Sequence, residues 1–333
     1  MPRISADNLG IHLFLQTLLI VQCVKQSADS TTSTIEDILS RKLMITSVEL
    51  EPYLMPMYVK ENGTYVKVYQ GFIVDLVYKL SRMLKFQYEL IPEPEGKYGH
   101  RNSHGLWDGM IGLLQRKKAD IAAAPLYITE YRQKVVDFTL PFMEVTATLL
   151  LRKPPSGVPN PISSYSDLIN QSEIKYGTLR TGLLVWAFRN TNNTLLQMLW
   201  RNMQRLDGES LTTTNDEGIQ RVRKEKYAFI IPTSIGEYIS NQIPCDLTTV
   251  DHFLLKAGYG LAVPKESPIL PALNRALAEL KRTGFLERLY HTWWFERTQC
   301  SDVINSSKMY DVSCAKQSHF GVVILTILLR ILL

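Results

Sequence analysis

The chain has 333 residues, of which 45% are hydrophobic and 21% charged, and its net charge is +5. This composition is typical of a globular protein with a sizeable core, organised as one large or two modest domains. Lys and Arg are interleaved with Asp and Glu, and no nucleic-acid-binding motif is present, which argues against nucleic acid as a partner.

The N-terminus predicts export from the cell. Arg3 precedes the apolar stretch LGIHLFLQTLLIVQC, and polar residues follow it. This pattern is typical of a secretory signal within residues 1–28, cleaved after Cys23 or nearer Ala28. A buried N-terminal helix is the alternative interpretation.

Strands and helices alternate along the first half of the remaining chain. We expect a strand within residues 42–55, a helix over 71–86, a strand over 86–92, a helix over 106–119 and a short strand over 120–126. The first of these helices has its apolar residues on one stripe: Ile73, Leu76, Val77, Leu80 and Leu84.

The alternation resumes after a Pro-rich break at residues 152–161. Ser166 is expected to cap a helix. Further elements are a strand over 174–179, helices over 181–190 and 214–226, a strand over 227–231, and an amphipathic segment over 268–294 that breaks at Thr283-Gly284. Strands that alternate with helices predict α/β architecture with parallel sheets, in which ligands bind at the carboxyl ends of strands. The stretch AAAPLYITEYR (122–132) follows one such end.

The C-terminus is apolar from Phe320 to Leu333, with Arg330 inside the run. A bilayer core requires about 20 apolar residues, so this run is too short to cross it. We expect a lipid-anchor signal, with small residues at 305–307 and a hydrophobic tail over 320–333 after a polar stalk over 301–319. A truncated membrane helix and a buried terminal helix are the alternatives.

Cysteine use agrees with an extracellular protein, either secreted or attached to the plasma membrane. The four cysteines are Cys23, Cys245, Cys300 and Cys314. Processing at both ends would leave Cys245 and Cys300 as a pair available for a disulfide in an oxidising compartment. Sequons for N-glycosylation occur at Asn62, Asn170, Asn192 and Asn305.

The sequence contains no catalytic or cofactor-binding motif. His100 and His104 lie in a polar loop without a third metal ligand, so we expect loop histidines rather than a zinc site. No phosphate-binding or dinucleotide-binding glycine motif and no nucleophile motif is present. We therefore expect neither an enzyme nor a cofactor.

Several long stretches are similar to a known family. They are EPYLM, GFIVDLVYKLSRMLKFQYEL, GKYG, LWDGMIGLLQRKKADIAAAPLYITEYRQKVVDFTLPFM, DEGIQRVRKEKYAFI, PCDL and GYGLAVPKESPILPALNRALAELKRTGFLERLYHTWW. Together they resemble the ligand-binding domain of ionotropic glutamate receptors over residues 43–300.

The resemblance implies a two-lobed clamshell of the periplasmic-binding-protein type II kind. The first lobe would comprise residues 43–145 and 259–300, and the second residues 146–258. Cys245 and Cys300 match the family's disulfide. In the receptors the pore lies where this chain has only RKPPSGVPNP, which contains no apolar run that could enter a membrane. The resemblance therefore implies a binding module without its channel.

The resemblance also implies a ligand site. Arg132 matches the arginine that grips the ligand carboxylate, and a guanidinium suits a carboxylate because it offers paired donors. Pro125 would supply a carbonyl, Tyr127 a backbone N–H, and Tyr53 an aromatic lid over the ligand.

Other matching positions depart from the family pattern. Leu183 and Leu184 stand where hydroxyl side chains are expected, and Pro232 stands where an acid receives the ligand ammonium. An unpaired buried charge costs about 3–5 kcal/mol, so glutamate should bind very weakly unless another carboxylate such as Glu237 replaces the missing acid.

Three hypotheses follow. The chain binds a small carboxylate ligand, and it either retains that ligand or regulates receptor subunits or other cell-surface proteins. Alternatively it is a ligand-free pseudo-receptor that holds protein partners, as the three departures favour. It could also be a fragment or splice product of a ligand-gated cation channel.

Overall fold

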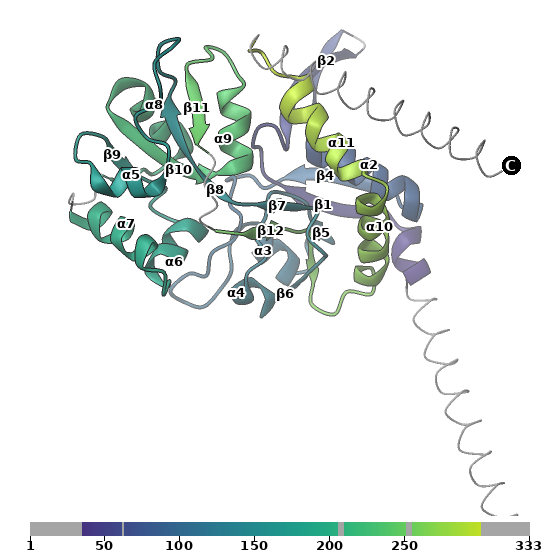
Figure 1. The fold of residues 1–333 in the computed structure, drawn as a ribbon. Coiled ribbons are helices and arrows are strands. Elements are labelled where there is room, and N and C mark those ends of the chain that lie inside the picture. Colours follow the sequence, from purple (N-terminus) through teal and green to yellow (C-terminus); the bar gives the residue numbers. More distant parts are fainter. Residues whose placement is uncertain (1–34, 62, 206–209, 251–254, 301–333) are drawn as a thin grey trace, which may run out of the picture.

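The computed structural model describes residues 35–61, 63–205, 210–250 and 255–300. The predicted signal, stalk and hydrophobic tail lie outside these residues, as do Cys23, Cys314 and the sequons at Asn62 and Asn305. Within the described residues the chain forms two α/β units that lie side by side (Figure 1).

The first unit is built on a five-stranded sheet. Its strands, in spatial order, are β4 (Tyr88–Pro92), β1 (Leu43–Ser47), β5 (Ile121–Ala122), β13 (Ala262–Pro264) and β6 (Val136–Phe138). β1 runs parallel to β4 and β5, whereas β13 is antiparallel to its neighbours. The carboxyl ends of β1 and β5 therefore meet at one edge of the sheet, as the sequence predicts for a ligand site.

Helical segments pack around this sheet, and all of those named next except α4 bury apolar side chains. They are α2 (Phe72–Leu84), α3 (Gly109–Gln115), α4 (Glu130–Gln133), α10 (Leu270–Arg282), α11 (Phe285–His291) and the π-helical turn η1 (Thr292–Glu296). The predicted stripe of α2 is confirmed, because Ile73, Leu76, Val77 and Leu80 are all buried. Gly284, with φ 66°, separates α10 from α11 at the predicted break.

The second unit is built on a four-stranded sheet. Its strands, in spatial order, are β11 (Leu247–Val250), β8 (Ala147–Arg152), β10 (Tyr227–Pro232) and β9 (Lys175–Gly177). Its helices are α5 (Tyr165–Asn170), α6 (Leu183–Arg189), α7 (Thr194–Arg205), α8 (Asn215–Lys224) and α9 (Thr233–Ser240). The apolar β8 and β10 are almost wholly buried, because helices cover both faces of this sheet.

The start of α5 differs from the prediction that Ser166 caps it. Ser164 is the capping residue, and its side chain accepts a hydrogen bond from the Asp167 backbone N–H at 3.0 Å. The Asp167 carboxylate in turn accepts from the backbone N–H and the hydroxyl of Ser163. The cap satisfies the Asp167 N–H in the first turn of the helix. The helix therefore begins two residues earlier than a cap at Ser166 would place it.

A short two-stranded sheet links the two units. β7 (Met143–Val145) pairs antiparallel with β12 (Ala257–Tyr259), and the chain passes between the large sheets next to both strands. A second pair, the hairpin β2 (Met55–Glu61) and β3 (Thr64–Gln70), projects from the first unit and was not predicted. Most of its side chains are exposed.

The Pro-rich segment is a short connection in the structure. β8 ends at Arg152 and α5 begins at Tyr165, with turns between them. Among the helices of the described residues, none combines the length and apolar character needed to span a bilayer.

Candidate functional site

The segment after β5 carries three of the predicted site residues. It leaves the sheet at Ala122, passes through Pro125 and Tyr127, and enters α4. The Thr129 side chain caps this helix by accepting from the Arg132 backbone N–H at 3.3 Å. The cap fixes the short helix, and with it the direction in which Arg132 leaves the backbone.

Arg132 is a partly buried cation without an anionic partner. Its Nη1 donates to the Tyr127 carbonyl oxygen at 3.0 Å, and no carboxylate of the described residues lies within ion-pair distance. Burial lowers the pKa of Arg132 to about 10, and the nearby Tyr98 and Tyr127 only partly oppose this effect. The protonated guanidinium is therefore held at a cost that a bound anion would relieve.

Tyr98 is a neighbour of Arg132 that the sequence analysis missed. Its phenol interacts electrostatically with Arg132 and with Tyr127, and burial raises its pKa. Tyr98 lies between Gly96 and Gly99, which both have positive φ. The stretch GKYG was one of those that carry the family resemblance. A tyrosine between two glycines was the sequence feature that could have identified Tyr98 as a site residue.

Tyr127 is held by backbone pairing with β12 and the residue after it. The Ile128 N–H donates to the Gly258 carbonyl at 3.0 Å, and the Gly260 N–H donates to the Leu126 carbonyl at 3.1 Å. The ring of Tyr127 lies 4.7 Å from that of Tyr259, and burial raises the pKa of Tyr127 to about 12. Its aromatic side chain thus forms one wall beside Arg132.

Two backbone groups of this segment complete the site. Within the described residues, neither the Tyr127 N–H nor the Pro125 carbonyl has a hydrogen-bond partner. A ligand carboxylate requires donors and a ligand donor group requires an acceptor. Arg132, the Tyr127 N–H and the Pro125 carbonyl supply both within one stretch of chain.

Tyr53 lies in the aromatic core between the two units, close enough to Tyr98 and Tyr127 to interact with them electrostatically. Its side chain is fully buried, and its hydroxyl donates to Ser234 Oγ at 2.8 Å. Its ring makes edge contacts with Phe72, Tyr259 and Trp294. Tyr53 thus joins the first unit to α9 of the second, and Tyr98 is the tyrosine next to Arg132.

The three departures from the family pattern belong to the second unit. Leu183 and Leu184 open α6, and Leu184 packs against the core of that unit. Pro232 ends β10 and stands directly before α9. Glu237, which could replace the missing acid, instead accepts a hydrogen bond from the Tyr290 hydroxyl.

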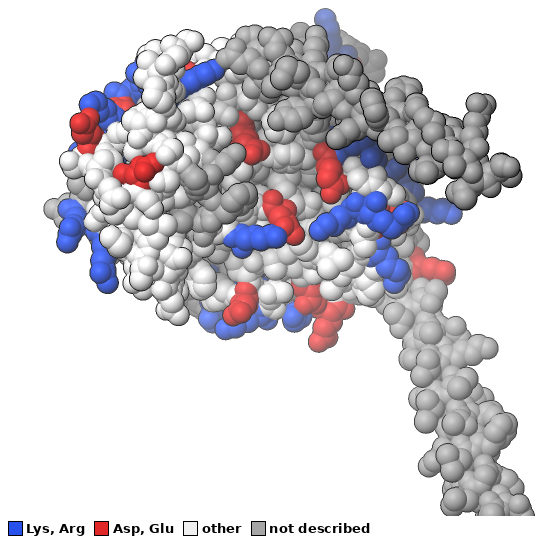
Figure 2. All heavy atoms as spheres, in the orientation of Figure 1, with Lys and Arg blue, Asp and Glu red and all other residues white. Residues whose placement is uncertain are grey.

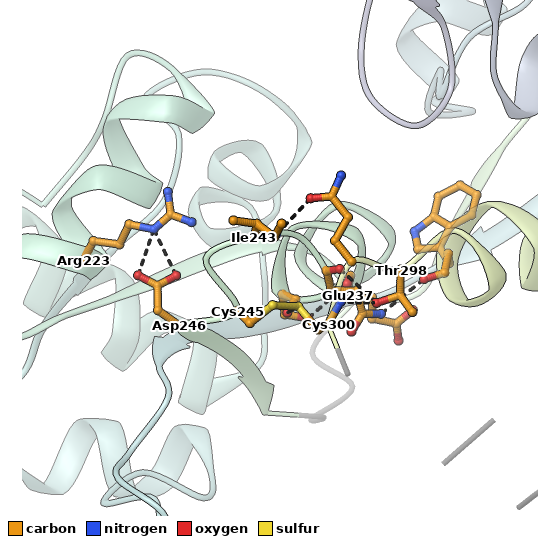
Figure 3. The surroundings of a disulfide bond; sticks show 11 residues. Arg223, Glu237, Ile243, Cys245, Asp246, Thr298 and Cys300 are labelled. Atoms are coloured by element: carbon orange, nitrogen blue, oxygen red, sulfur yellow. Dashed lines mark hydrogen bonds and ion pairs between the residues drawn. A yellow bond between two sulfur atoms is a disulfide. The ribbon is translucent and has the colours of Figure 1, made fainter. Parts of the chain in front are cut away.

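Cys245 and Cys300 form a disulfide with a Cα–Cα distance of 5.7 Å (Figure 3). It joins the chain just before β11 to the last residue that the structure describes. The sequons at Asn170 and Asn192 are exposed, which suits a glycan. Among the described residues, His100 and His104 are part of no cluster of three potential metal ligands.

Comparison with known proteins gives consistent matches. Residues 41–155 match the family described as the ligated ion channel L-glutamate- and glycine-binding site. Glutamate receptor 3 of Homo sapiens is 26% identical over 392 aligned positions, which cover 81% of this chain and 44% of the relative. Glutamate receptor 3 of Rattus norvegicus is 26% identical, with coverage of 85% and 45%.

The chain spans less than half the length of these relatives. The human alignment runs over 392 positions although the chain has only 333 residues, so it contains long gaps on the side of this chain. The family match ends at residue 155, inside the Pro-rich connection.

Proposed function

We propose that the chain is a ligand-binding domain of the ionotropic glutamate receptor kind, as its matches to that family support, and that it binds a small carboxylate ligand through Arg132 outside the cell. Domains of this family are two-lobed clamshells of the type II periplasmic-binding-protein kind, and the family is one of receptors rather than enzymes. The observation that carries the proposal is the partly buried, unpaired guanidinium of Arg132.

The ligand is a carboxylate with an apolar body. Its carboxylate pairs with Arg132 and accepts from the Tyr127 N–H, and its body lies against the rings of Tyr98 and Tyr127. Glutamate fits poorly, because Pro232 offers no charge to an ammonium group and Glu237 is engaged by Tyr290. A buried ammonium without a partner costs about 3–5 kcal/mol, which lowers affinity by two to three powers of ten or more.

A thermal-shift measurement tests this proposal. The full-length chain, secreted from a eukaryotic host, is heated with glutamate and with a series of apolar monocarboxylates. A ligand present at one hundred times its Kd stabilises the native state by about 2.7 kcal/mol. An apolar carboxylate should raise the Tm, glutamate should raise it less, and Arg132→Ala should abolish both shifts.

Arg116→Ala is the matched control. Arg116 also donates to a backbone carbonyl, that of Trp107, but its side chain is exposed and lies outside the site. The variant should keep the ligand response. If no carboxylate shifts the wild-type Tm, or if the shift survives in Arg132→Ala, the proposed ligand chemistry is wrong.

A ligand-free pseudo-receptor is the second candidate. It is favoured by side-chain contacts that join the two units directly, namely Tyr53 with Ser234 and Tyr290 with Glu237. In that case the lobe surfaces hold receptor subunits or other cell-surface proteins, and no carboxylate alters the Tm.

We place the protein outside the cell, exported by the signal within residues 1–28 and attached to the plasma membrane by the tail at 320–333. The short connection between β8 and α5 supports a module without a pore, because it has no apolar segment. Exposed sequons at Asn170 and Asn192 support export.

A further inference from the structure

A second candidate binding site lies at the opposite end of the first sheet. A groove of about 620 Å³ opens between the C-terminal end of α2 and the residues that lead into β1 and β4. Its lining residues are Lys42, Tyr78, Ser81, Arg82, Lys85, Phe86, Gln87 and Tyr88. Three of them are cations and none is an acid.

The groove lies far from Arg132. Lys42 directly precedes β1 and Gln87 directly precedes β4, so the groove is at the amino ends of these parallel strands. Arg132 follows the carboxyl end of β5, which is parallel to β1. A strand of five residues spans roughly 16 Å, so the two sites occupy opposite edges of the sheet.

Two of the three cations have no carboxylate partner. Arg82 and Lys85 are exposed and make no ion pair with any described residue, whereas Lys42 pairs with Glu89 at 2.7 Å. Arg82 and Lys85 stand at the C-terminal end of α2, where cations complement the helix dipole. Lys42 belongs to another element, so the dipole does not explain why it also lines the groove. Figure 2 shows Lys and Arg side chains gathered over α2 and α10 on this side of the molecule.

Aromatic side chains form the walls of the groove. Tyr78 has 58% of its surface exposed, and the half-buried Tyr88 lies beyond it. The Phe86 ring is buried and meets Tyr88 edge-on, with 6.2 Å between centroids. The site thus combines flat apolar surfaces with exposed positive charge along the edge of the groove, and the Gln87 amide adds neutral hydrogen-bonding groups.

We infer that this groove binds a sulfated oligosaccharide. The apolar C–H faces of sugar rings suit exposed tyrosines, sulfate groups suit Arg82 and Lys85, and ring hydroxyls suit the Gln87 amide. An anionic membrane is a poorer match, because a flat lipid surface would contact the exposed cations but would not enter the groove lined by Phe86 and Tyr88. A long-chain sulfated glycan can also remain bound in an open groove through counterion release.

Binding of a heparin hexasaccharide to the full-length protein, measured by calorimetry at near-physiological salt, tests the site. The double variant Arg82→Gln/Lys85→Asn should bind about tenfold more weakly, because it loses two charge contacts. Asn suits position 85, where φ is 58°. Tyr78→Ala, at an exposed position, should also weaken binding by several-fold although it keeps every charge.

The matched control is Arg201→Gln/Lys224→Asn. It removes one Arg and one Lys from exposed positions on α7 and α8, and neither has an ion-pair partner among the described residues. The control and Arg132→Ala should both bind the hexasaccharide as the wild type does, since the carboxylate site is elsewhere. The chemically desulfated hexasaccharide should not bind.

Three results would overturn the assignment. An equal loss of affinity in the Arg201/Lys224 control would show attraction to net charge alone. Unchanged affinity in Tyr78→Ala would show that the exposed Tyr78 ring does not bind the sugar. Binding to phosphatidylserine vesicles without binding to the hexasaccharide would identify a lipid surface instead.

Discussion

Arg132 holds a charge that no residue in the described part of the chain neutralises. Among those residues its guanidinium donates a hydrogen bond to the Tyr127 carbonyl, and burial lowers its pKa to about 10. Below that pH both the folded and the unfolded chain carry the proton, so the folded state bears the cost of the charge at neutral pH. As the pH rises above about 10 towards the ordinary pKa of an arginine, the folded state releases the proton first and stability increases.

Replacement of Arg132 by methionine should therefore stabilise the unliganded protein. An apolar side chain of similar length removes the unpaired charge, and the free energy of unfolding should rise by about 1–2 kcal/mol. Urea denaturation at neutral pH measures the change. In Arg116→Met, where the exposed guanidinium also bonds to a carbonyl, no gain is expected. A loss of stability in Arg132→Met would mean that the guanidinium has a structural role.

The sequence located the local part of this site but not the distant part. Pro125, Tyr127 and Arg132 lie within eight residues of each other, so one motif identifies them together. Tyr98 and Tyr259 reach the same place from distant segments, and only the folded sheet brings them there. The position of Tyr53 was equally hard to predict, since its burial depends on rings contributed by Phe72 and Trp294.

At the scale of elements, α9 contributes several contacts between the two units. It packs on the second sheet, yet its Tyr238 lies against the core of the first unit. The Ser234 carbonyl accepts from Trp294 Nε1 at 2.5 Å, and the Asn241 side chain donates to the Trp294 carbonyl at 3.2 Å. These contacts hold the units together beside the position of Pro232.

Tyr290→Phe should weaken this junction. The variant removes the hydroxyl that donates to Glu237, so the partly buried carboxylate has one hydrogen bond fewer. The free energy of unfolding should fall by about 1–2 kcal/mol. Urea denaturation measures the loss, and the exposed hairpin residue Tyr65 provides the control variant Tyr65→Phe. Equal stability of the two variants would show that the Tyr290 hydroxyl contributes nothing to the junction.

Apolar periodicity identified several helices in advance, although α7 was not predicted despite its buried stripe of Leu196, Leu199, Trp200 and Met203. α2 and α10 carry clear stripes, and the break at Gly284 was visible in the sequence. The β2–β3 hairpin was missed because both of its faces are largely exposed, so no hydrophobic alternation marks a buried side. α9 was missed because its eight residues, TSIGEYIS, carry only Ile235, Tyr238 and Ile239 as large apolar side chains, too few to mark a stripe.

At the scale of the whole molecule, the short connection between β8 and α5 underlies the proposal of a module without a pore. Fewer than fifteen residues join these elements. On this proposal, the full chain expressed alone in oocytes should pass no current when a carboxylate ligand is added. Two-electrode voltage clamp checks this, with a complete glutamate receptor as the positive control, and a ligand-gated current would refute the pore-less assignment.

The Cys245–Cys300 bond has a mechanical consequence. Cys300 follows η1 of the first unit, and the disulfide links it to Cys245, which lies just before β11 of the second unit. Tension that arrives along the backbone beyond Cys300 is therefore shared by both units at one point. A pull on the C-terminal segment would act on the clamshell at its junction, and it would reorient the whole domain rather than separate its halves.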